Sequence, residues 1–200
     1  MVSTKINRSF PEARIYFLSE ITGPNYPVKH LIEQARNKGH ITKGKPGRGG
    51  GVVTSQDMAI LLLGTLAGDT PQTATDAMMK LSDLSPNTSE IKTSDFSVSG
   101  LDNEWWNKQY VDVISDLIDA WRQNFHLGFD DMTFSVQRSA IFYGSIIWNN
   151  IPYERDLIIN YYPRHETKPA YVEDQRRIKA SLNGEILRDI ADWLEGREGH

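Results

Sequence analysis

The chain has 200 residues, a net charge of −4 at pH 7 and no cysteine. This length suffices for a hydrophobic core, and the lack of cysteine excludes disulfides and thiolate zinc sites. With no run of 18 apolar residues and no hydrophobic leader, the sequence predicts a cytoplasmic protein without membrane contact. Residues 1–53 carry nine lysines and arginines against three acids, a net +6, whereas the remainder carries 13 against 23, a net −10. This asymmetry favours a basic binding module joined to an acidic, partner-contacting body.

The first third of the chain predicts three helices, over residues 10–21, 27–38 and 55–67. The apolar residues of the second recur at the spacing of a helix that buries one face; they are Val28, Leu31, Ile32 and Ala35. Two prolines separate it from the first helix, and Gly39 suits the left-handed position that ends it. Thr54 caps the third helix, with Asp57 completing an acidic variant of the capping box.

A basic, glycine-rich loop, Thr42–Gly51, joins the second helix to the third. A helix, a turn, a second helix and a basic loop follow one another here, as they do in modules that bind DNA. In such modules the second helix lies in the major groove and nearby basic residues contact phosphates. We therefore expect double-stranded DNA to be contacted by Asn25, Tyr26, Lys29, His30, Arg36, Lys43, Lys45 and Arg48. We also expect Glu33 to face the major groove. The alternative interpretation of the loop is a solvated linker without a ligand.

The run from Gly23 to Leu63 resembles the DNA-binding half of MerR-type winged-helix proteins, and its layout is similar to prophage helix-turn-helix regulators. The residues that carry the resemblance are Asn37–Ile41, which end the recognition helix, Gly44–Gly51 in the place of the wing, and Val52–Met58, a short strand and a capped helix. The resemblance implies a winged helix-turn-helix fold and DNA binding. Three consecutive glycines and a wing without an aromatic residue depart from the family pattern. The long coiled-coil helix that would follow is also missing, so effector sensing is not implied.

The rest of the chain predicts a second domain. A fourth helix is expected over Thr73–Leu84, and the polar stretch 85–103 is a linker between domains 1–84 and 104–200. In the second domain we expect helices over Glu104–Gln123 and Glu173–Leu194 around a three-stranded antiparallel meander. The strands are Met132–Gln137, Ala140–Trp148 and Leu157–Tyr162. The predicted class is α+β, with the second domain serving oligomerisation or a protein partner.

Catalytic motifs are nearly absent. Residues 39–45 match the start of a phosphate-binding Walker A loop, but Pro46 stands where a serine or threonine would bind magnesium. Asp130–Asp131 and Glu154–Asp156 suit loop solvation better than a nuclease metal site, and the scattered histidines have no metal-ligand spacing. We expect no enzyme activity, no catalytic residue, no metal and no cofactor.

Two functions from different classes remain. The first is a sequence-specific, homodimeric DNA-binding regulator of phage or mobile-element type, whose acidic half contacts a protein partner. The second is a non-catalytic interaction factor, either an inhibitor or a packaging adaptor similar to a small terminase. Oligomer size separates them, because a dimer favours a regulator, a ring favours packaging and a monomer without DNA affinity favours an inhibitor.

Overall fold

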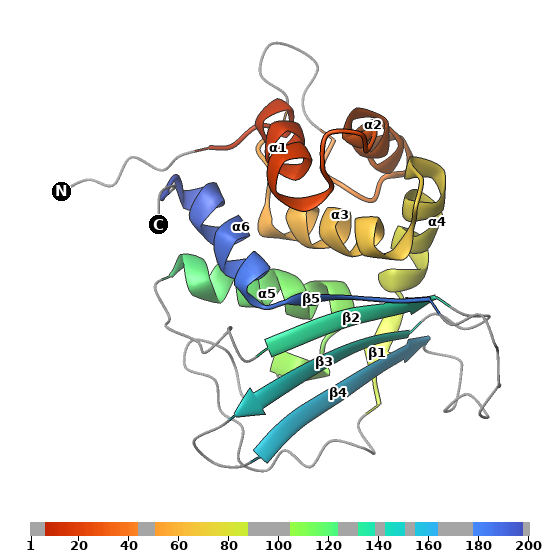
Figure 1. Ribbon diagram of the computed structural model, residues 1–200, viewed down its shortest axis with the longest axis vertical. Coiled ribbons are helices and arrows are strands. Elements are labelled where there is room, and N and C mark those ends of the chain that lie inside the picture. The colour runs from red at the N-terminus through yellow and green to blue at the C-terminus, as the bar shows by residue number, and fades with distance from the viewer. Residues whose placement is uncertain are drawn as a thin grey trace.

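The computed structural model describes residues 7–43, 51–87, 105–123, 132–138, 143–150, 155–163 and 178–197. Four helices from the N-terminal part gather at one end of the molecule, and an antiparallel sheet forms the other end (Figure 1). The last two α-helices, α5 (Tyr110–Arg122) and α6 (Glu185–Glu195), lie between them. The architecture is therefore mixed α+β. Within the described part of the chain, none of the helices has the length and apolar character needed to cross a membrane.

Local capping signals set the helices of the first half. Helix α1 (Phe10–Tyr16) begins after Ser9, whose N–H donates to Glu12 at 2.8 Å, and continues into a π-helical turn, Phe17–Ile21. Helix α2 (Val28–Lys38) ends at Gly39 with a φ of 80°. Helix α3 (Ser55–Ala67) has the predicted bounds. Helix α4 (Pro71–Leu81) begins earlier than predicted because Thr70 caps it and a proline occupies its first position.

Helix α3 is the centre of the molecule. Ten of its residues are buried, so it contacts neighbours on nearly every side. It packs against α4 and α5 and also touches α6 and the sheet. Buried residues from both sides of the predicted 85–103 linker belong to one hydrophobic cluster, which runs from Phe10 to Leu194. Most of the expected linker lies outside the described residues.

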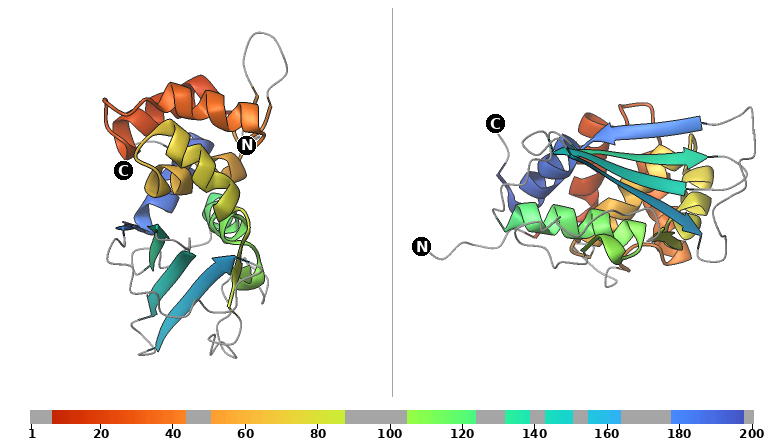
Figure 2. Two further views of the ribbon diagram at one scale, coloured as in Figure 1. Left: turned by 90° about the vertical axis from the view of Figure 1, so that its right-hand side faces the viewer. Right: turned by 90° about the horizontal axis from the view of Figure 1, so that it is seen from below.

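The sheet has five strands in the order β1-β4-β3-β2-β5, and every neighbouring pair is antiparallel. The strands are β1 (Leu84–Pro86), β2 (Met132–Arg138), β3 (Tyr143–Asn150), β4 (Arg155–Pro163) and β5 (Ile178–Asn183). Strands β2, β3 and β4 pair in chain order, and β5 returns beside β2, which is the strand order of a Greek key. Viewed from below, α5 lies against one face of the sheet (Figure 2).

Two predictions about this half are wrong. The sheet is not a three-stranded meander, because β1 and β5 extend it at its two edges. The last helix does not span Glu173–Leu194, because residues 178–183 form β5 and α6 begins at Glu185. Ile178 and Leu182 fit a helical spacing as well as an alternating one. These residues form a strand and not a helix because they pair with β2, where Leu182 lies opposite Phe134.

Candidate nucleic-acid interface

The outer side of α2 carries a stripe of exposed polar side chains, formed by Lys29, His30, Glu33 and Asn37, which we call the outer stripe. The exposed fractions of the first three side chains are 63%, 68% and 50%. Among the described residues, their polar contacts lie within α2: the Glu33 carboxylate lies 3.9 Å from Lys29 Nζ and 3.5 Å from His30 Nδ1. Exposed pairs of this kind contribute little to folding, so these groups are available to an external ligand.

Four buried side chains on the opposite side of α2 explain this orientation. Val28, Leu31, Ile32 and Ala35 face the core, as the sequence pattern predicts. The outer stripe lies about half a turn around the helix axis from these four residues, on the opposite side of α2. Because a helix cannot rotate without exposing that apolar face, the outer stripe is fixed toward solvent.

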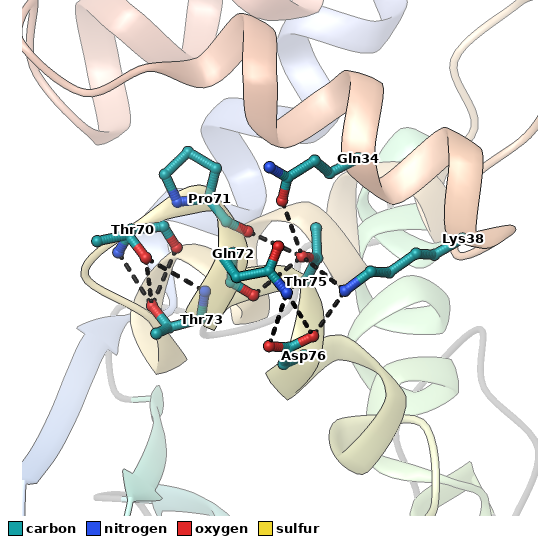
Figure 3. Close-up of polar contacts among 8 residues, drawn as sticks. All are labelled: Gln34, Lys38, Thr70, Pro71, Gln72, Thr73, Thr75 and Asp76. Carbon is teal, nitrogen blue, oxygen red and sulfur yellow. Dashed lines mark hydrogen bonds and ion pairs between the residues drawn. The ribbon is translucent and has the colours of Figure 1, made fainter.

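A polar network fastens the flank of α2 to α4 (Figure 3). Lys38 Nζ lies 2.6 Å from Asp76 Oδ1 and 3.4 Å from Thr75 Oγ1, and the Thr75 hydroxyl donates to Gln34 at 3.2 Å. Gln72 also donates to Asp76. The hydrogen bond from Lys38, with that from Gln72, holds the pKa of Asp76 below its usual value. Lys38 therefore helps to hold α2 against α4.

Two of the predicted DNA contacts are partly engaged within the protein. The Arg36 guanidinium lies 4.5 Å over the ring of Phe10, and its Nε is buried without a hydrogen-bond partner among the described residues. Half-buried Tyr26 points its hydroxyl at the carbonyl of Gly68, 3.5 Å away. Burial, reinforced by the Asp69 carboxylate, raises the pKa of this phenol. Arg36 joins α1 to α2, and Tyr26 holds the turn before α2 against the end of α3.

The remaining predicted contacts lie around α2. Asn25, in the preceding turn, and Lys43, beyond its C-terminus, are both exposed. His40, which is not a predicted contact, lies at the end of α2 and is half-buried; burial, together with the Lys38 ammonium, lowers its pKa, while Asp76 acts in the opposite direction. Lys45 and Arg48 lie outside the described residues.

Asn37 is a candidate contact that the sequence prediction does not include, because its position marks the end of the predicted helix. The signal was present in the spacing, since Lys29, Glu33 and Asn37 recur every four residues and share one side of α2. An asparagine amide can donate and accept at the same time, which suits the edge of an adenine. The described residues contain no group of three or more metal-ligating side chains.

Comparisons with protein-family models, curated protein sequences and solved structures found no match to this chain. Function is therefore inferred from the geometry of α2 and its surroundings.

Proposed function

We propose that the chain binds double-stranded DNA through the outer stripe of α2 and acts as a sequence-specific regulator. The observation that carries this proposal is the contrast between the two sides of α2. Gln34 and Lys38 are bound to α4, whereas the outer stripe contacts only itself among the described residues. A helix that is held firmly and projects donors and acceptors to solvent suits the major groove.

The electrostatics near α2 support the same proposal. Lys29 and Lys43 are exposed cations on and just beyond α2, and Arg14 on α1 is exposed as well. In the proposed complex the lysines contact phosphates, and His30 and Asn37 face base edges. The protein partner for the acidic half, the homodimer and the phage-type role belong to the same proposal.

The test is a fluorescence-anisotropy titration of the full chain with random duplex DNA across a range of salt concentrations. We expect log affinity to fall linearly with log salt, and Lys29→Ala and Lys43→Ala each to reduce that slope by about one. Lys80→Ala is the matched control, because it removes one exposed cation from α4. Equal slopes in Lys29→Ala, Lys43→Ala, Lys80→Ala and the unaltered chain would contradict the proposal.

A second function, the non-catalytic interaction factor, is favoured by one observation. Glu33 places a negative charge in the middle of the outer stripe, where it opposes a nearby phosphate and suits a mixed-charge protein surface. Glu33→Gln separates the two. If the stripe binds DNA, removing the carboxylate strengthens binding to random duplex. If it binds a protein, the unaltered chain and Glu33→Gln both lack DNA affinity.

A further inference from the structure

The third residue of α3, Asp57, is buried, with 2% of its surface exposed. One oxygen of its carboxylate, Oδ2, accepts hydrogen bonds from the backbone N–H and the hydroxyl of Thr54, each at 2.9 Å. This is the capping box that the sequence predicts. The other oxygen, Oδ1, accepts from the backbone N–H of Thr42 at 2.7 Å, across 15 residues of chain.

Thr42 and Thr54 flank the basic, glycine-rich segment, so a single carboxylate holds both of its ends. Other contacts fix the same two points. Ile41 and Val53 are buried beside them, and Val53 N–H donates to the carbonyl of Arg8 at 2.9 Å. The entry and exit of the segment are therefore tied to the start of α3 and to the residues that precede α1.

A cap alone does not account for this arrangement. Capping the N-terminus of α3 requires only the Thr54 contacts, which occupy Oδ2. Thr42 is exposed, and water can satisfy its N–H in the absence of Asp57. The bond from Thr42 to a buried, charged acceptor is strong and directional, and its structural effect is to fix the path of the chain after α2.

We propose that Asp57 is a positioning residue that clamps the two ends of the basic segment and so fixes exposed Lys43 beyond the C-terminus of α2. Its effect on nucleic-acid binding rests on the proposed function. The clamp itself depends on one hydrogen bond, from the Thr42 N–H to Asp57 Oδ1, and can be tested without any ligand.

Hydrogen exchange of individual amides in the full chain tests the clamp. In Asp57→Ala we expect the Thr42 amide to exchange at least about tenfold faster. Thr54→Ala is the matched control, because it removes the capping hydroxyl and keeps both backbone donors to Asp57. In that variant the Thr42 amide stays within about threefold of its rate in the unaltered chain.

The Val53 amide is the internal reference, since it donates to a backbone carbonyl and not to Asp57. Unchanged protection of Thr42 in Asp57→Ala overturns the clamp. Equal loss of protection at Thr42 and Val53 also overturns it, because the variant then opens this region as a whole.

Binding to random duplex DNA gives the second readout. Asp57→Ala removes no cation, yet we expect its affinity to fall about tenfold, with Thr54→Ala unchanged. Thr42→Pro removes the same hydrogen bond from the donor side and leaves the cap intact. It should weaken binding to a similar extent even where Asp57→Ala folds poorly.

The outcomes distinguish the clamp from the proposed function. If the unaltered chain does not bind DNA at any salt concentration, the proposed function fails, while the exchange rates still decide whether the clamp exists. If the unaltered chain binds DNA and both clamp variants bind equally well, the positioning role is overturned and the proposed function stands.

Discussion

Helices α2 and α5 are both amphipathic, yet their polar sides are used differently. On α5, Asp112 accepts from Gln56 at 2.9 Å, Asp116 lies 2.7 Å from Lys108, and Asp119 accepts from Ser55 at 2.5 Å. Two of these three partners belong to α3. On the outer stripe of α2, Lys29 and His30 both pair with Glu33, which belongs to α2 itself. Polar groups that bind other elements hold the fold together, whereas groups that contact only their own helix remain open to a ligand.

This comparison also separates the two basic side chains near the end of α2. Lys38 contacts α4 and Arg36 contacts Phe10 of α1, so both stabilise the packing of their helix. Their positive charge alone did not show this. We therefore expect substitutions in α5 and its neighbours to change the free energy of unfolding, and substitutions in the outer stripe to change binding.

The largest effect is expected where α5 meets the sheet. The Tyr110 hydroxyl donates to the carbonyls of Ser135 and Ser145, at 2.9 Å and 3.3 Å. Its ring lies over Gly144, where an added Cβ would come within 2.5 Å of a ring carbon. Gly144→Ala should therefore lower the free energy of unfolding by about 3 kcal/mol, through overpacking and the displaced hydroxyl. Urea unfolding followed by tryptophan fluorescence measures it, and a loss under about 1 kcal/mol would refute the packing argument.

A smaller effect is expected from Arg122 at the end of α5. Its guanidinium contacts Glu195 at 2.8 Å, Asp119 at 3.0 Å and Ser55 at 3.1 Å, and so joins three helices. Arg122→Ala should cost about 1–2 kcal/mol. Lys29→Ala is the matched control, because the exposed Lys29 pairs with Glu33 of its own helix, and it should stay within about 0.5 kcal/mol. Equal losses in the two variants would remove the distinction between bridging and surface charges.

A still smaller effect on the free energy of unfolding is expected from the protonation of His40. Burial, then the Lys38 ammonium, lowers its pKa in the folded chain, so the unfolded chain takes up the proton first as the pH falls. The stability that neutral His40 contributes is therefore present above its unfolded pKa and decreases as the pH falls from about 7 toward 5. His40→Gln should flatten this dependence. The measurement is the urea midpoint at pH 7.5 and 5.5, and parallel midpoints in both proteins would contradict the prediction.

The smallest effect on stability is expected from the outer stripe. Lys29→Ala and Asn37→Ala remove exposed side chains, so their free energies of unfolding should stay within about 0.5 kcal/mol of that of the unaltered chain. In contrast, Asn37→Ala should relax sequence preference in a selection from a random duplex library, because it removes a base-edge contact. A destabilisation equal to that of Arg122→Ala would show that the stripe is structural after all.

The amino-acid sequence by itself determined the features that depend on neighbours within about one helical turn. The start of α3 follows from the Thr54–Asp57 cap, whose side chains contact backbone three residues away. The left-handed Gly39 follows from its lack of a Cβ, which leaves a positive φ without strain. The apolar side of α2 was also readable, because helical periodicity fixes which side chains share a face.

Tertiary structure decided whatever depends on segments that are distant along the chain. The strand β5 exists because β2 pairs with it, although its residues also fit a helix. Lys38 forms an ion pair with Asp76, and the second carboxylate oxygen of Asp57 accepts a hydrogen bond from Thr42. Both contacts exist because packing of the helices brings these groups within hydrogen-bond distance. A sequence pattern indicates which kinds of contact each residue can make. Which partner it meets depends on how the whole core packs, and no local pattern contains that information.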